Sequence, residues 1–150
     1  METIVKESGS GKFTQEIIIG KHKLIADELL INGGNDTGPS PYDFLLSALG
    51  SCTSMTLRVY ADFKKIPLQK TVVILKYEKI YIEDCSNCED PKSKIDHITR
   101  RIELHGDLTQ EQREKLLAIA NQCPVHRTLT SKILITTELN VPEIFVRDKK

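Results

Sequence analysis

The chain has 150 residues, 39% of them apolar and 28% charged, which is the range of an ordinary globular protein with one core. Lys and Arg together number 21, as do Asp and Glu, so no net charge favours nucleic acid or an anionic membrane. We therefore predict a single domain over residues 1–150, with no nucleic acid among its partners.

The N-terminal residues contain no basic segment followed by an apolar stretch, so they do not resemble a signal peptide. The longest uncharged run, residues 44–57, is shorter than the roughly 20 residues that a membrane-spanning helix needs. We expect a cytoplasmic protein with no membrane among its partners.

The first third of the chain is typical of β structure. Residues 14–19 and 22–30 are apolar-rich and flank Gly20 and Lys21, which predicts a hairpin with a short polar turn. Residues 32–40 are dense in turn formers and predict a loop.

A helix is predicted to begin at Pro41. Ser40 is suited to the N-cap, Pro41 to the first helical position, and Asp43 to the third position of a capping box. Residues 44–57 carry no charge on any face, which predicts a helix buried on most sides. Its small residues would let another helix or a second subunit approach closely.

Two strands are predicted in the middle of the chain, over residues 71–82 and 98–104, because both are rich in β-branched and apolar residues. The polar segment 83–94 between them predicts an exposed loop.

A second capping box, Thr109 with Gln112, predicts another helix. Its apolar stripe ends at Cys123, and Pro124 then predicts a break in the helix at this cysteine. Residues 132–139 predict a closing strand. Because hairpins dominate and regular βαβ alternation is absent, the fold class is α+β with largely antiparallel sheets.

The four cysteines are the residues most suited to chemistry. Without an export signal they are expected to be reduced. Cys52 lies in the uncharged helix and Cys123 at the end of the apolar stripe, and each taken alone fits a buried, inert thiol.

The surroundings of these two cysteines resemble one known family. Residues 38–57, GPSPYDFLLSALGSCTSMTL, are similar to the helix that bears the first cysteine in OsmC/Ohr proteins. Residues 120–129, ANQCPVHRTL, are similar to the second cysteine motif of the same superfamily. The order of elements also fits, so the resemblance covers nearly the whole chain, and it is strongest to the branch described as predicted redox proteins.

The resemblance implies an interlocked homodimer, with sheets wrapped around central helices, that reduces organic hydroperoxides or hydrogen peroxide. Cys52 would attack the O–O bond, and Cys123 would resolve the resulting sulfenic acid as a disulfide. A dithiol reductant would then restore both thiols, and no cofactor would be required.

The chain departs from this family in the residues that activate the thiol. The characterised peroxidases place an arginine in the N-terminal strands and a glutamate just after the proline that opens the first helix. Here no arginine precedes Arg58, and Tyr42 follows that proline. A thiolate at neutral pH needs a nearby cation or helix dipole, and the candidate replacements are Arg58, His126 and Arg127.

Cys85 and Cys88 form a separate Cys-x-x-Cys pair in the polar loop. The pair supplies two of the four ligands of a structural zinc site, and His97 or a second subunit are possible completions. The surrounding acids would raise the thiol pKa and so oppose nucleophilic use. A metal or redox function of this pair and an incidental exposed loop both remain open.

Two functions are compatible with these observations. The first is a thiol-dependent peroxidase that uses Cys52 and Cys123. The alternative is a non-catalytic ligand-binding or redox-sensing dimer with the same fold. They differ in whether the cysteine pair has thiolate character.

Overall fold

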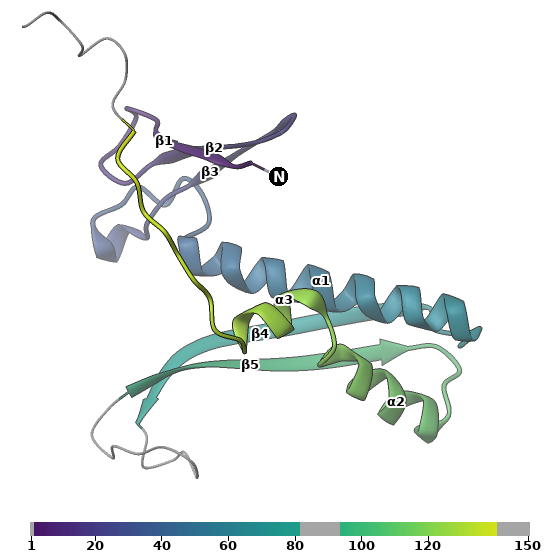
Figure 1. The fold of residues 1–150 in the computed structure, drawn as a ribbon. Coiled ribbons are helices and arrows are strands. Elements are labelled where there is room, and N and C mark those ends of the chain that lie inside the picture. The colour runs from purple at the N-terminus through teal and green to yellow at the C-terminus, as the bar shows by residue number, and fades with distance from the viewer. Residues whose placement is uncertain (1, 82–93, 141–150) are drawn as a thin grey trace, which may run out of the picture.

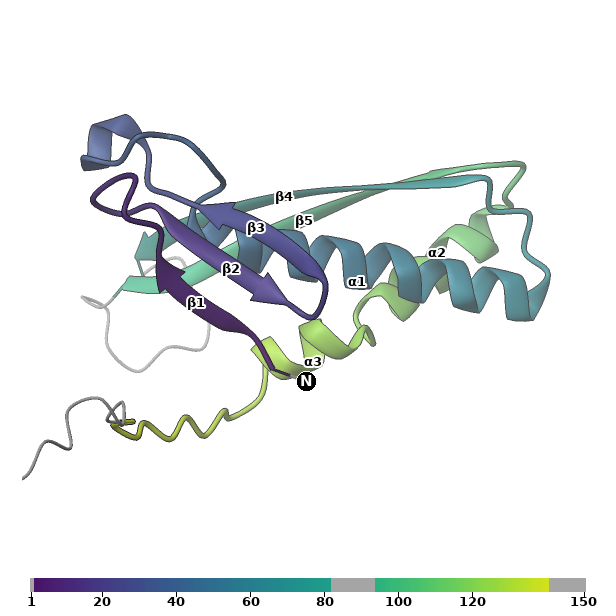
Figure 2. The ribbon, with the colours of Figure 1, turned by 90° about the horizontal axis from the view of Figure 1, so that it is seen from above.

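The computed structural model describes residues 2–81 and 94–140. It has the predicted α+β class, with an N-terminal antiparallel sheet, a second antiparallel sheet and helices packed on it. Figure 1 shows the N-terminal sheet beyond the start of the long helix α1 (Pro41–Lys64), on the side opposite the second sheet. Seen from above, it overlies only the N-terminal part of that helix (Figure 2).

The N-terminal sheet has the strand order β1-β2-β3, where β1 is Ile4–Glu7, β2 is Gln15–Ile19 and β3 is His22–Ala26. The predicted hairpin is confirmed, with Gly20 at a φ of 58° in its turn, a conformation that glycine adopts without strain. The sequence patterns did not predict β1.

The third strand ends earlier than predicted because Asp27 redirects the chain after Ala26. The buried Asp27 carboxylate accepts hydrogen bonds from the backbone of Glu28, Asn35 and Thr37 and from the Thr37 hydroxyl. These bonds close the following loop, which includes the short 3-10 helix η1 (Leu30–Asn32), and bring the chain back to the start of α1.

The second sheet pairs β4 (Lys70–Tyr81) with β5 (Lys94–His105). Lys70 lies opposite His105 at one end and Tyr81 opposite Lys94 at the other. Both predicted strands are confirmed, and β5 begins earlier than predicted. Its early residues are polar on one face, because a two-stranded ribbon leaves much of its surface in solvent.

Helix α1 crosses the second sheet and contacts α2 (Gln110–Ala120) and α3 (Pro124–Leu129). The buried core joins α1, the segment after it and α2, and consists of Leu57, Ala61, Leu68, Leu116 and Ala120. Within residues 2–81 and 94–140, no helix combines the length and the apolar character that crossing a membrane requires.

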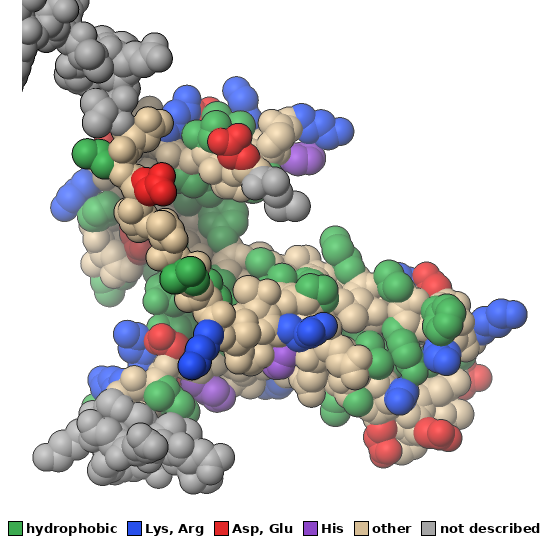
Figure 3. All heavy atoms as spheres, viewed as in Figure 1, with side chains coloured by type: hydrophobic (Ala, Val, Ile, Leu, Met, Phe, Trp, Pro, Cys, Tyr) green, Lys and Arg blue, Asp and Glu red, His purple; other side chains and the backbone are tan. Residues whose placement is uncertain are grey.

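The prediction that α1 is buried on most sides is wrong for the single chain. One stripe is buried, whereas Met55, Val59 and Phe63 are 67%, 69% and 77% exposed. Figure 3 shows hydrophobic side chains along this open side of α1. One sheet and two shorter helices cover only part of a helix of 24 residues.

The closing strand predicted over residues 132–139 is also wrong for the single chain. This segment has no regular secondary structure and is exposed throughout. Its β-branched composition favours an extended backbone, but within the described residues no strand lies alongside it to complete a ladder.

Candidate functional site

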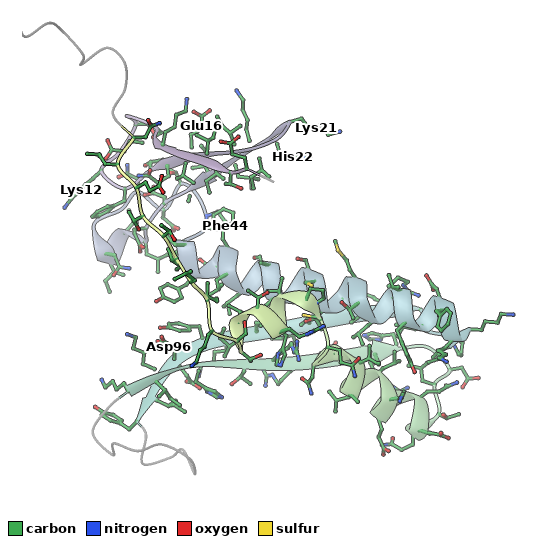
Figure 4. The ribbon with its side chains drawn as sticks, viewed as in Figure 1. Lys12, Glu16, Lys21, His22, Phe44 and Asp96 are labelled. Atoms are coloured by element: carbon green, nitrogen blue, oxygen red, sulfur yellow. The ribbon has the colours of Figure 1, made fainter. Side chains whose placement is uncertain are left out.

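The start of α1 determines which residues of this helix face the sheet. The Ser40 backbone N–H donates to the Asp43 carboxylate over 2.9 Å, and the Asp43 N–H donates to the Ser40 hydroxyl over 3.3 Å. The predicted capping box is therefore confirmed. From this start, the helical period turns Leu49, Thr53 and Leu57 into the interior. Phe44, in the first turn, lies between α1 and the N-terminal sheet in Figure 4.

The second cysteine lies at the predicted break between α2 and α3. The stripe through Leu116 and Ala120 is buried and continues to Cys123, which is also fully buried. Cys123 has φ −61° and ψ 138°, an extended conformation, and serves as the N-cap of α3. Pro124 causes this geometry, because its ring disfavours a helical conformation in the preceding residue.

The Cys123 sulfur is surrounded by hydrogen-bond donors. The His126 backbone N–H donates to Sγ over 3.3 Å, and the Thr53 hydroxyl lies 3.6 Å from it. Burial raises the pKa of the Cys123 thiol, but the hydrogen bonds from His126, Thr53 and Cys52 and the charge of Arg100 outweigh burial and lower it. These interactions favour the thiolate form of Cys123.

Arg100 lies on β5 and links this site to the sheet. Its Nη1 donates to the Thr53 hydroxyl over 2.8 Å, and its Nη2 donates to the Asn121 side-chain oxygen over 2.7 Å. Arg100 was not among the candidate cations predicted from the sequence. A signal was present, since it stands between Ile98 and Ile102 at an inward position of an alternating strand, where a charged residue is unusual.

Cys52 has a different environment from Cys123. It is half-buried on the flank of α1 and lines an open pocket of about 780 Å³. The pocket is mainly apolar, with Met55, Val59, Phe63 and Val125 among its lining residues. Cys52 is also among the groups that lower the pKa of the Cys123 thiol. Both cysteines are free thiols.

The candidate cations named from the sequence lie in three different places. Arg58 donates to the carbonyl oxygens of Leu68 and Gln69, over 2.6 and 3.0 Å, and thereby fastens the connection between α1 and β4. His126 contributes its backbone N–H to Cys123, and its side chain is half-buried. Arg127 is exposed on α3.

Arg100 lines a second pocket, of about 410 Å³. Its polar lining residues include Asp96, Arg100, Asn121 and His126. Asp96, labelled on β5 in Figure 4, accepts a hydrogen bond from Tyr77 and lies 3.8 Å from Lys79. Its charge is therefore directed to partners other than Arg100.

Cys85 and Cys88 lie outside the described residues, so the zinc site that they would form stays a prediction. Within the described ranges, no cluster of three or more His, Cys, Asp or Glu side chains is arranged to hold a metal ion. His97, the possible third ligand, has its Nδ1 3.5 Å from the Glu78 carboxylate.

Comparison with known proteins connects this arrangement to one family. The model of the family described as OsmC-like protein matches residues 33–138, which is more than half of the chain. Curated protein sequences include no match.

Solved structures share the fold. An OsmC-like protein from Mycoplasma pneumoniae is 19% identical with a TM-score of 0.66, covering 85% of each chain. An organic hydroperoxide resistance protein from Legionella pneumophila, also called a predicted redox protein, is 21% identical with a TM-score of 0.62, covering 87% of this chain and 90% of its own. The organic hydroperoxide resistance protein OhrB of Bacillus subtilis is 15% identical with a TM-score of 0.59, covering 86% and 89%.

Proposed function

Since the chain belongs to the OsmC-like protein family, we propose that it is a thiol-dependent peroxidase that reduces organic hydroperoxides or hydrogen peroxide through Cys52 and Cys123. The observation that carries the proposal is a thiol that opens onto an apolar pocket, together with a second thiol whose pKa is lowered by its hydrogen-bond partners and by the nearby Arg100. Relatives of the same fold named organic hydroperoxide resistance proteins support the choice of substrate.

The two thiols supply the groups that such a reaction needs. A sulfur attacks one oxygen of the peroxide, the O–O bond breaks, and an alcohol leaves while the sulfur becomes a sulfenic acid. The second thiol attacks this sulfur, forms the disulfide and expels the oxygen as water. A dithiol reductant then returns the disulfide to two thiols, so the cycle needs no metal or organic cofactor.

The apolar pocket beside Cys52 favours organic hydroperoxides over hydrogen peroxide. Its lining includes Met55, Val59 and Phe63, which would bury the hydrocarbon part of a substrate. Each buried methylene is worth about 0.8 kcal/mol, or roughly a fourfold gain in affinity. We expect turnover efficiency to rise from small to larger alkyl hydroperoxides.

The test is peroxide consumption by the purified protein with a dithiol donor. We expect Cys52→Ser and Cys123→Ser each to abolish most of the turnover. The matched control is the double variant Cys85→Ser with Cys88→Ser, which we expect to retain turnover because the acids in that loop disfavour the thiolate.

If Cys52→Ser leaves peroxide reduction unchanged, the pair is not the catalyst. The alternative, a ligand-binding or redox-sensing protein, would then be favoured by the open apolar pocket. Loss of bound zinc and of stability in the Cys85 and Cys88 double variant would instead assign that pair to a structural metal site.

We also propose that the protein is a homodimer. Support comes from the open side of α1, where the pocket beside Cys52 would then lie at the subunit interface, and from the C-terminal segment, where Leu134 and Leu139 are 92% and 89% exposed. Contiguous apolar surface of this kind is unusual in monomers and marks interaction sites. Light scattering at micromolar concentration should give twice the chain mass, and a folded monomer would contradict the proposal.

A further inference from the structure

Arg100 has no carboxylate partner among the described residues, although it is only partly exposed. Its two terminal nitrogens donate to neutral oxygens, those of Thr53 and Asn121. Partial burial of a charge costs desolvation free energy unless an opposite charge compensates it. Asp96 and His126 line the same pocket, but Asp96 bonds Tyr77 and His126 is a potential cation, so neither compensates Arg100.

We propose that Arg100, acting through the Thr53 hydroxyl, holds the negative charge of the reduced cysteine pair on Cys123, so that Cys52 begins the cycle protonated. Arg100 is then the positioning cation that replaces the missing N-terminal arginine. The inference rests on the proposed thiol chemistry and adds to it the location of the charge.

The contacts form a continuous chain from guanidinium to sulfur. Arg100 Nη1 lies 2.8 Å from Thr53 Oγ1, and this oxygen lies 3.6 Å from Cys123 Sγ. The Thr53 hydroxyl has one hydrogen and two acceptors within reach, the Leu49 carbonyl at 2.7 Å and the sulfur. When the sulfur is ionised, the hydroxyl can turn toward it and make a stronger, charge-assisted bond.

Among the described residues, no charged side chain of this kind lies in the pocket of Cys52. The residues that line its pocket are apolar or neutral polar, and none of them is charged. The fold therefore divides two requirements between the cysteines. Charge is stabilised at the buried Cys123, and access for an apolar substrate is provided at Cys52.

The reaction then begins with a proton transfer inside the pair. Cys52 passes its thiol proton to the Cys123 thiolate, and the Cys52 thiolate attacks the peroxide, giving a sulfenic acid and an alkoxide. The alkoxide takes the proton from Cys123 and leaves as the alcohol. The Cys123 thiolate attacks the Cys52 sulfenic acid, forming the disulfide and releasing hydroxide. Two electrons pass from the two thiols to the peroxide.

The experiment titrates each thiol separately by ultraviolet absorbance of the thiolate and by alkylation rate against pH. Cys85 and Cys88 are replaced by serine throughout, and either Cys52 or Cys123 is also replaced, so that one thiol remains. We expect the lone Cys123 to ionise at lower pH than the lone Cys52. Ionisation of Cys52 at lower pH than Cys123 would overturn the proposal.

Arg100→Gln and Thr53→Val should both raise the pH at which Cys123 ionises. Loss of a nearby cation typically changes a pKa by about 1 or more, which is at least a tenfold lower thiolate fraction below the pKa. Arg101→Gln is the matched control, since Arg101 is the next residue on β5, is exposed and faces away from the site. It should leave the titration unchanged.

The outcomes separate this inference from the proposed function. If peroxide reduction needs both cysteines but Arg100→Gln and Thr53→Val leave the Cys123 titration unchanged, the role of Arg100 is wrong and the peroxidase proposal stands. If neither cysteine is needed for reduction, the peroxidase proposal fails whatever the titration shows. Should Arg100→Gln fail to fold, the Cys123 titration of Thr53→Val tests the inference instead. Valine keeps the shape of the threonine side chain and removes its hydroxyl.

Discussion

Leu116 lies in the core between α1 and α2, and its replacement by alanine tests how much this core contributes to stability. Its side chain has no exposed surface and packs in a cluster with Leu57, Ala61 and Leu68. Leu→Ala removes three carbon atoms, which at about 0.8 kcal/mol each is roughly 2.4 kcal/mol of transfer free energy. The remaining cavity extends the expected loss to about 2–5 kcal/mol.

The assay is urea unfolding followed by far-ultraviolet circular dichroism, with the protomer concentration kept constant because dimerisation contributes to apparent stability. Leu117→Ala is the matched control, since Leu117 is the next residue of α2 and is 57% exposed. It removes the same atoms and should cost less than about 1 kcal/mol. Equal losses for the two variants would refute the assignment of Leu116 to the core between α1 and α2.

Two further predictions concern charged residues outside the thiol pair. Hydrogen bonds from the Thr37 hydroxyl and from three backbone N–H groups lower the pKa of Asp27 from 3.8 to about 2, outweighing its burial. A depressed carboxyl pKa contributes stability that is present above 3.8 and is lost as pH falls toward 2. Asp27→Asn should therefore melt at a lower temperature than the parent at pH 7. The difference between the two melting temperatures should narrow as the pH falls from 3.8 toward 2. A constant difference would contradict a stabilising role of the ionised Asp27 carboxylate. Arg58→Gln should lower stability by about 1 kcal/mol, through the lost bonds to Leu68 and Gln69, with no shift in the pH profile of peroxide reduction. A shifted profile would restore Arg58 as an activating cation.

Local sequence patterns were sufficient for most of the secondary structure. The capping boxes at Ser40 and Thr109 predicted the starts of α1 and α2, because their side-chain oxygens satisfy backbone groups that a helix start leaves unpaired. Gly20 predicted the hairpin turn, and Pro124 predicted the break at Cys123. These signals involve residues within a few positions of one another.

The packing of α1 could not be read from its own residues. Absence of charge over residues 44–57 predicted burial, but a pattern on one helix does not say how much covering surface the rest of the chain provides. The same holds for residues 132–139, where composition favours a strand but a ladder needs a neighbour.

The sequence alone determined the two cysteine-bearing segments and their local geometry, because capping, periodicity and the effect of proline are short-range properties. Only the tertiary structure decided which cation lies beside the buried Cys123. Arg58 lies close to Cys52 in sequence but is directed to the carbonyl oxygens after α1, whereas Arg100 is 47 residues from Thr53 and bonds to it. The pairing of β5 with β4 and the packing of α1 on this sheet bring them together. Electrostatic interaction depends on distance in space, and the fold alone sets that distance.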